Sequence, residues 1–98
     1  MVALVVKIKA AQGKEKELEK HLRETSKWIR ENEKTTLQFS VLRKAGEPTE
    51  FCLFERYKDR DAWQITHRSS TNYQEGRAKT AGLVAGPPEI IEYEVLEP

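Results

Sequence analysis

The spacing of apolar residues changes period several times along this chain, and the order of those periods limits its possible folds more than any other feature. Apolar residues alternate over residues 4–10, which predicts a strand that ends at Gly13. From Lys14 the apolar residues take helical spacing, which predicts an amphipathic helix that ends in the polar run 32–35. The apolar stripe of this helix consists of Leu18, Leu22, Thr25 and Ile29.

The middle of the chain predicts a β-hairpin. Apolar residues alternate with polar ones over residues 37–41, and a second strand-like run covers residues 51–58. The segment 45–49 between them is rich in turn-forming residues, including Gly46 and Pro48. Two strands joined by so short a connection pair as neighbours in an antiparallel sheet.

A helical region with a break follows the hairpin. Asp59 is placed to cap a helix N-terminus, and the hydroxyl cluster 69–71 competes with the helix backbone and predicts a kink or an interruption. A second helical piece is expected over residues 72–80, opened by a capping box of Thr71 and Gln74. Glycine and proline over residues 82–88 end it before a last strand over residues 89–95.

The resulting order, β-α-β-β-α-β, favours an α+β, ferredoxin-like fold in a single domain over residues 1–98. This fold has one antiparallel sheet with two helices on one face. Both faces of the sheet are expected to be apolar, because Phe51 and Leu53 point one way while Cys52 and Phe54 point the other. The uncovered face is expected to bury itself against a second copy, giving a homodimer whose sheets form a closed α+β barrel.

Composition narrows the classes of function. The chain has 17 basic and 16 acidic side chains and a formal net charge of +1, so it lacks the basic surface that a nucleic-acid partner requires. No apolar run approaches the length of a membrane span, and the N-terminus has no signal-peptide pattern. The single cysteine, Cys52, cannot form an internal disulfide, which fits a reducing compartment. We therefore expect a cytoplasmic protein without a membrane or nucleic-acid partner.

The candidate functional residues lie within the broken helical region and the strand before it. Large flat rings beside a guanidinium suit a planar, electron-rich ligand, whereas a plain packing helix more often carries Leu, Ile and Val. Each residue also has a purely structural interpretation, such as core packing for the tryptophan, a surface ion pair for the arginine and helix capping for the asparagine. The cluster consists of Tyr57, Trp63, His67, Asn72, Tyr73 and Arg77.

In order and spacing, the chain resembles the antibiotic biosynthesis monooxygenase family, small dimeric α+β barrels that include anthrone and quinol oxygenases. The resemblance extends over nearly the whole sequence. It includes the first strand closed by Gly13, the KEKEL helix start, WIRE from Trp28, NEKTTLQFSVLR, FERYKDRDAW, His67 and the GLVAGPP ending. In the anthrone-oxidising branch, an aromatic residue ends the third strand, another opens the next helix and an arginine lies further along. Those three places are occupied here by Tyr57, Trp63 and Arg77, with Tyr and Trp exchanged.

The chain also departs from these patterns. The anthrone-oxidising branch has an asparagine in the third strand and a histidine in the second, where this chain has Leu53 and Arg43. His67 matches a histidine of the quinol-oxidising branch, but that branch has a second histidine where this chain has Asn72. In haem-degrading relatives an iron-binding histidine aligns with Arg77, which cannot ligate iron, so haem degradation is disfavoured.

The resemblance implies a cofactor-independent monooxygenase that oxidises a planar phenolic, anthrone or quinol-type, polyketide-like aromatic with O₂. The sequence has no motif for a flavin, nicotinamide, phosphate or metal, so the substrate would have to supply the electrons. In that mechanism Arg77 stabilises the anion, His67 or a neighbouring water takes the proton, and Trp63 helps to hold the rings. The expected substrate-binding residues are Tyr57, Tyr73, Asn72 and Trp28.

Two other functions fit the same sequence. One is a non-catalytic dimeric barrel that binds or carries a small molecule. The other is an isomerase or lyase that acts on a polyketide in the same slot. A direct test of O₂ uptake separates both of them from an oxygenase.

The absence of cofactor motifs generates a first prediction. The purified protein should be colourless, with no flavin or haem absorbance and no stoichiometric metal, because no segment of the sequence is built to hold such a group. Absorbance spectra and elemental analysis of the protein as purified measure this. A Soret band that survives gel filtration and depends on His67 would contradict it.

Overall fold

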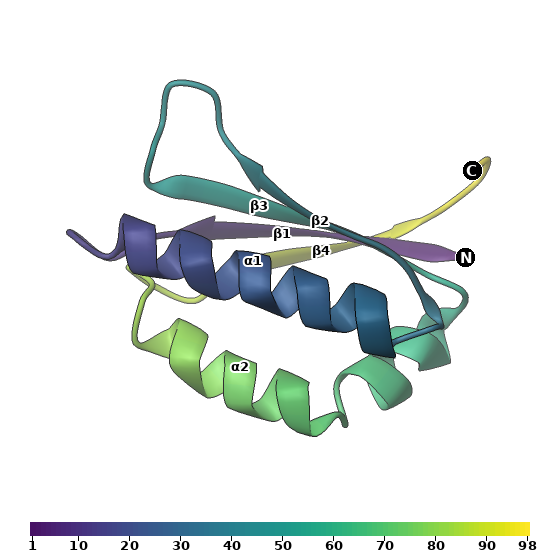
Figure 1. The fold of residues 1–98 in the computed structure, drawn as a ribbon. Coiled ribbons are helices and arrows are strands. Elements are labelled where there is room, and N and C mark those ends of the chain that lie inside the picture. The colour runs from purple at the N-terminus through teal and green to yellow at the C-terminus, as the bar shows by residue number, and fades with distance from the viewer.

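A computed structural model describes the whole chain, Met1–Pro98. Its elements are β1 (Val2–Lys9), α1 (Glu15–Asn32), β2 (Thr36–Arg43), β3 (Glu50–Tyr57), the π-helix η1 (Ala62–His67), α2 (Thr71–Ala81) and β4 (Glu89–Glu94). All strands pair antiparallel in one sheet of order β2-β3-β1-β4. Both long helices lie on the same face of this sheet (Figure 1). The predicted α+β, ferredoxin-like β-α-β-β-α-β fold is therefore confirmed.

The strand register decides which side chains face the helices. In the central pair, Leu4 of β1 lies opposite Glu55 of β3, and Val6 lies opposite Leu53. Residues directly opposite one another in an antiparallel pair share a face of the sheet. The row that faces the helices therefore consists mainly of aliphatic and aromatic residues, and Glu55 is its one buried acid.

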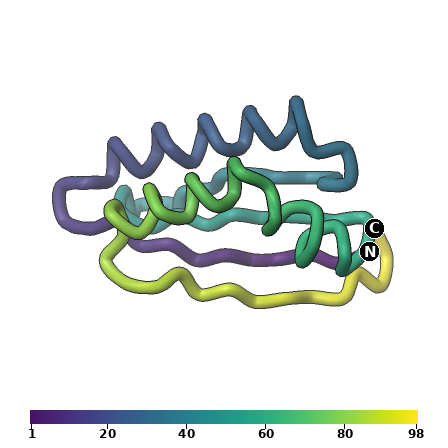
Figure 2. The backbone as a smooth tube through the Cα atoms, turned by 90° about the horizontal axis from the view of Figure 1, so that it is seen from below, coloured from purple at the N-terminus to yellow at the C-terminus, as the bar shows by residue number.

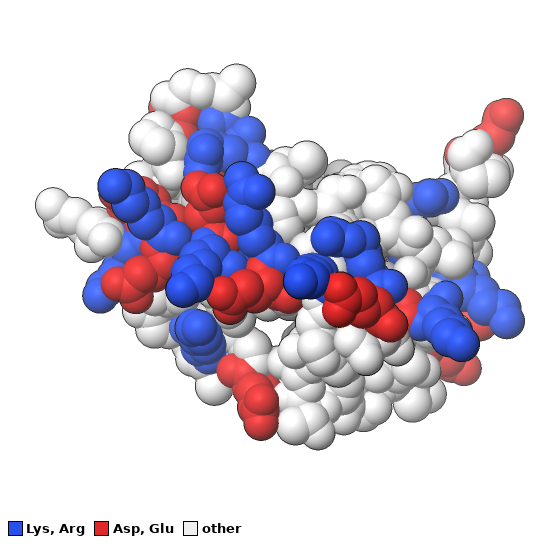
Figure 3. Space-filling view, viewed as in Figure 1, with Lys and Arg blue, Asp and Glu red and all other residues white.

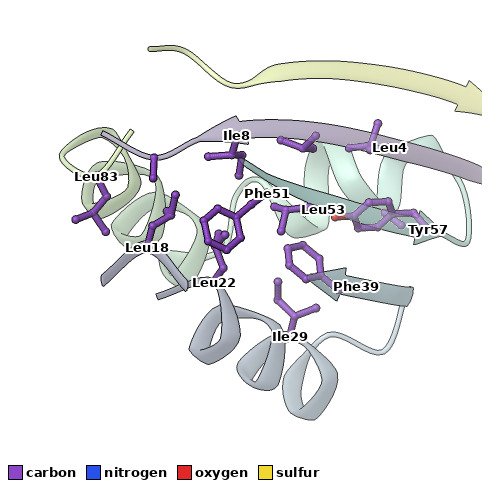
Figure 4. Close-up of a cluster of buried hydrophobic side chains, with 13 residues drawn as sticks. Leu4, Ile8, Leu18, Leu22, Ile29, Phe39, Phe51, Leu53, Tyr57 and Leu83 are labelled. Carbon is purple, nitrogen blue, oxygen red and sulfur yellow. The ribbon is translucent and has the colours of Figure 1, made fainter. Parts of the chain in front are cut away.

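Helix α1 packs closely on the sheet. Its buried residues Leu18, Leu22 and Ile29 meet Phe39, Phe51 and other residues of the sheet in a single apolar cluster (Figure 4). The Ser26 hydroxyl donates a hydrogen bond to the Phe39 carbonyl oxygen at 2.9 Å, so the helix is also tied to β2 by a polar contact. These contacts confirm the predicted apolar stripe, except that Ser26 replaces Thr25 among the buried residues.

Helix α2 packs differently, because none of its residues is buried. It is held mainly by the segments at its two ends. At its N-terminus, Ser70 accepts a hydrogen bond from the Tyr73 amide at 3.0 Å and donates one to the His67 carbonyl at 2.9 Å. Beyond its C-terminus, the buried Leu83 and the bridge between Ala10 and Val84 attach the chain to the end of β1. Viewed from the helical side, α2 runs beside α1 and along the direction of the strands (Figure 2).

The helical region after β3 differs in detail from the expected one. Asp59 does cap it, since its Oδ1 accepts a hydrogen bond from the Ala62 amide at 2.9 Å. The turn that follows is a π-helix, in which the Arg68 amide bonds to the Trp63 carbonyl five residues earlier. The predicted break occurs, but Ser70 caps α2 in place of the predicted box of Thr71 and Gln74.

The sheet face away from the helices is partly open and carries apolar side chains together with Lys7, Gln38, Ser40 and Arg56. Cys52 and Phe54 of β3 point to this side, since they alternate with the buried residues Phe51, Leu53 and Glu55. Their neighbours on the face include Leu42, Val5, Ile91 and Tyr93. The expectation that both faces of the sheet carry apolar side chains is therefore confirmed. Among the helices, none is long and apolar enough to span a membrane.

This open face generates a second prediction, that the protein is a homodimer joined through it. Phe54→Glu should weaken or abolish the dimer, because it would bury a charge in the interface. Light scattering at micromolar concentration measures the mass. Ile65→Glu is the matched control, since Ile65 is exposed on η1 and should leave the dimer intact. A monomeric wild-type protein would remove the argument.

Candidate functional site

A cavity of about 690 Å³ lies between the helices and the sheet. It exists because α1 packs against the strands whereas α2 does not, so the space beneath α2 is not filled by side chains. A hollow is visible between α1 and α2 in the space-filling view (Figure 3). The cavity is within the usual size range of small-molecule sites.

The two walls of the cavity have different chemistry. The sheet wall is mostly apolar and includes Leu4, Val6, Ile8, Phe39, Leu53 and Ile90. The helical wall is largely polar or aromatic, because one face of α2 points inward at helical spacing. The residues of that face are Asn72, Tyr73, Gly76, Arg77, Thr80 and Ala81. The apolar sheet wall, which forms the floor of the cavity, and the polar helical wall above it together suit a flat ligand with a few oxygen substituents.

His67 and Glu33 form a buried pair at one end of the cavity. Nδ1 of His67 lies 2.8 Å from Oε1 of Glu33, and both side chains are buried. Oε1 also accepts a hydrogen bond from the Thr36 hydroxyl at 2.9 Å, whereas Oε2 is buried without a partner. An ionised carboxylate only accepts hydrogen bonds, so it places the proton of a neutral imidazole on Nδ1. The lone pair is then on Nε2, and His67 itself lines the cavity.

Local structure explains this pair. Glu33 follows the last residue of α1 and lies four positions beyond the buried Ile29, so it continues the buried stripe of the helix. His67 and Ala62 are five positions apart and are both buried, because one turn of a π-helix brings such residues to the same side. The imidazole ring is packed among Phe39, Tyr57 and Tyr73, with centroid distances of 6.2, 5.5 and 5.0 Å.

A second buried acid lies close to this pair. Glu55 lines the cavity from the middle of β3, and its Oε1 accepts a hydrogen bond from the Tyr57 hydroxyl at 2.5 Å. Burial raises the pKa of the Glu55 carboxyl, an effect only partly offset by the Tyr57 hydrogen bond and by His67. Burial, together with the adjacent Glu55, also raises the pKa of the Tyr57 phenol, which therefore stays protonated.

His21 joins the two helices along another part of the cavity. Its Nε2 lies 3.1 Å from the Gly76 carbonyl oxygen and 2.9 Å from the Thr80 hydroxyl. Burial lowers the pKa of His21 and the nearby Lys79 lowers it further, although the Gly76 contact acts in the opposite direction. The neutral imidazole is therefore the form that ties α1 to α2.

Five of the seven residues predicted for the site line this one cavity: Trp63, His67, Asn72, Tyr73 and Arg77. Arg77 is exposed to solvent, so it belongs to the rim. Its guanidinium forms no ion pair. The structural interpretation of Arg77 as one member of a surface ion pair is therefore not supported. Trp63 is half-buried, and the guanidinium of Arg68 lies 5.7 Å from the centroid of its ring.

Two predicted substrate contacts do not lie in the cavity. Tyr57 is fully buried behind the cavity wall, where its ring contacts His67 and its hydroxyl binds Glu55. Trp28 is 36% exposed and lies outside the cavity. The α1 residues that border the cavity are His21, Leu22 and Thr25, and Trp28 lies almost one helical turn beyond Thr25.

Glu33 and Glu55 are the site residues that sequence reasoning missed. Each carried a signal, because each occupies a buried position of a regular pattern. Glu33 extends the helical stripe of α1, and Glu55 is the acid within the core-facing alternation of Phe51, Leu53 and Tyr57. A buried acid in an apolar pattern requires a partner, and a functional role is a common reason for one. No group of three or more His, Cys, Asp or Glu side chains is arranged to hold a metal ion.

Comparison with known proteins identifies a family. Residues 1–79 match the family model described as "Antibiotic biosynthesis monooxygenase". A structure from Nitrosomonas europaea, provisionally classed as an antibiotic biosynthesis monooxygenase, superposes with a TM-score of 0.90 at 26% identity, covering 99% of this chain and 100% of that one. A protein from Mycobacterium tuberculosis gives a TM-score of 0.89 at 25% identity, covering 99% and 96%. A second Nitrosomonas europaea protein, of unknown function, gives 0.86 at 26% identity, covering 99% and 90%. A search of the curated proteins found no match.

The His21 contact generates a third prediction, on stability against pH. The pKa of His21 is lower in the folded chain than its unfolded value of 6.5, so the unfolded chain binds the proton first as the pH falls. Because burial opposes the charged imidazole, the stability associated with neutral His21 is fully present above about pH 6.5 and is lost as the pH falls through the folded-state pKa. Thermal unfolding from about pH 7.5 to about pH 5.5 should show a smaller fall in Tm for His21→Gln than for the wild type. Parallel profiles would contradict this.

Proposed function

The chain belongs to the antibiotic biosynthesis monooxygenase family, and we propose that it is a cofactor-independent monooxygenase of a planar phenolic, anthrone or quinol-type aromatic. The observation that carries this proposal is one cavity with an apolar floor, aromatic side chains in its helical wall and a buried His67–Glu33 pair at one end. Such a cavity can hold flat rings away from bulk water and can also remove a proton from them. The proposal adds a substrate class and residue roles to the family membership.

The first role is to hold the rings. Trp63 and Tyr73 present aromatic surface in the helical wall, opposite the aliphatic floor of Leu4, Val6 and Leu53. Contacts between aromatic rings and a flat apolar floor favour a planar ligand over a bulky one. The proposal assigns substrate positioning to these side chains.

The second role is that of a base. With Nδ1–H directed at Glu33, the Nε2 lone pair of His67 is available to accept a proton from the substrate. Glu33 would then stabilise the imidazolium that forms and hold its orientation, as a carboxylate does beside a catalytic histidine. The buried Oε2 of Glu33 accepts no hydrogen bond. A positive charge on His67 would therefore be the nearest group to balance the negative charge of this carboxylate.

The third role is to stabilise the substrate anion. Deprotonation spreads negative charge over the aromatic system and its oxygens, and Arg77 lies at the rim of the cavity with a free guanidinium. The delocalised anion then reduces O₂ directly. For an anthrone, the ring methylene becomes a carbonyl. One oxygen atom of O₂ enters that carbonyl, and the other leaves as water with the two hydrogens of the methylene.

The test of this function is O₂ uptake by the purified protein with an anthrone and with a hydroquinone under air. Uptake that depends on protein concentration and disappears in His67→Gln would support the oxygenase. Binding of the aromatic without O₂ uptake would favour the non-catalytic barrel. Conversion of the substrate without O₂ uptake would favour an isomerase or lyase.

A fourth prediction separates binding from chemistry. Arg77→Ala should lower turnover, and because its guanidinium is exposed at the rim, the loss should lie toward the lower end of the roughly 10²–10³-fold range for one oxyanion donor. Trp63→Ala should instead raise KM with little change in kcat, because it removes ring contact that substrate and transition state share. Steady-state kinetics measure both. Arg60→Ala is the control, since Arg60 lies outside the cavity and pairs with Glu92. Equal kinetics for Arg77→Ala and the wild type would contradict the role of Arg77.

A further inference from the structure

Glu55 is a buried acid in the cavity wall that the reaction above does not use. It is only 4% exposed and lies on the row of the sheet that faces the helices. Its partners across the neighbouring strands are Leu4 and Phe39, which are both buried and apolar. An acid in such surroundings costs free energy unless its polar atoms are bonded.

The two oxygens of Glu55 are not equivalent. Oε1 accepts the hydrogen bond of the Tyr57 hydroxyl, which fixes the orientation of the carboxyl group. Oε2 has no hydrogen-bond partner in the protein. Only Glu33 Oε2 and Trp63 Nε1 are fully buried without a partner, so Oε2 of Glu55 keeps some accessible surface. Because Glu55 is almost fully buried and lines the cavity, Oε2 is the atom that a ligand in the cavity can reach.

We propose that Glu55 is a further catalytic residue, a neutral carboxylic acid that donates a hydrogen bond through Oε2 to an oxygen atom of the bound aromatic. This inference rests on the oxygenase function proposed above and adds the group that holds the substrate oxygen beside His67. It also gives the two buried acids different roles: Glu33 orients the base, whereas Glu55 contacts the substrate.

The surroundings of Glu55 favour the neutral form. The apolar wall raises its pKa, and the negative charge of Glu33 at the end of α1 acts in the same direction. The Tyr57 hydroxyl from β3 acts against this increase, as does His67 from η1 when its ring is protonated, and the Tyr73 ring from α2 lies 5.0 Å from the His67 ring. A carboxylic acid kept neutral by an apolar site can donate a hydrogen bond to a developing oxyanion.

The proton and the electron pair of the reacting C–H bond are then both accounted for by groups at one end of the cavity. Nε2 of His67 takes the proton from the ring carbon, and the electron pair of that C–H bond enters the ring. The resulting negative charge is carried largely by the ring oxygen, which accepts the hydrogen bond of Glu55 while Glu55 keeps its own proton. An ionised Glu55 would instead repel this anion.

Binding of an unreactive probe, 2-naphthol, tests the inference, because its absorbance distinguishes the phenol from the phenolate. Glu55→Gln should bind naphtholate within about threefold of the wild type, since the side-chain amide also donates a hydrogen bond. Glu55→Leu should lose about 10- to 100-fold in affinity, the scale of one hydrogen bond to a charged group. Glu94→Leu is the control, because Glu94 is exposed on β4 and lies outside the cavity. Tighter naphtholate binding by Glu55→Gln or Glu55→Leu would show an ionised Glu55 and overturn the inference.

A second measurement decides the question even where Glu55→Leu does not fold. Infrared spectra of the wild type should contain the C=O stretch of a protonated carboxyl at neutral pH, and this band should be missing in Glu55→Gln. Its absence from the wild type would overturn the inference.

If naphtholate binding depends on Glu55 but no aromatic supports O₂ uptake, the donor role stands and the oxygenase function fails. If O₂ uptake is unchanged in Glu55→Leu, the function stands and the inference fails.

Discussion

Helix α2 is held beside the sheet by polar contacts and by the segments at its ends rather than by an apolar face of its own, and the cavity depends on that constraint. The helix has no buried residue, so burial of an apolar stripe cannot draw it onto the strands. Its position is maintained by the Ser70 cap, by the contacts of His21 with Gly76 and Thr80, and by the buried Leu83 beyond its end. A conventional apolar helix at this place would close the cavity.

The polar groups of the cavity wall occupy positions that a stable core would fill with aliphatic residues. Glu33 continues the buried face of α1, Glu55 interrupts the core-facing row of β3, and His67 is buried under η1. Each of them has at least one hydrogen-bond partner, which limits the cost of burial. Functional sites commonly gather such groups, since a buried polar side chain can act on a ligand without competition from bulk water.

The fold could be predicted from the sequence because each of its elements has a regular period. The alternation over β1 and β3 and the stripe of α1 are local patterns that survive in the tertiary structure. The family resemblance was also accessible, since it depends on the order of short segments. Details of the helix starts were less accessible: Ser70 and Thr71 are both good caps, and only the geometry after the π-helix selects Ser70.

The sequence by itself determined the order of the elements, the two-faced sheet, the family and five of the residues that line the cavity. The tertiary structure decided which of those residues can reach a ligand. Tyr57 looks like a ligand contact in sequence, but the register of β3 and the cover of η1 bury it behind Glu55. Glu33 and His67 are 34 positions apart, so only the packing of η1 against the end of α1 could bring them within a hydrogen bond. Local periods encode which side of an element is buried, whereas contacts between distant elements depend on how those sides are brought together.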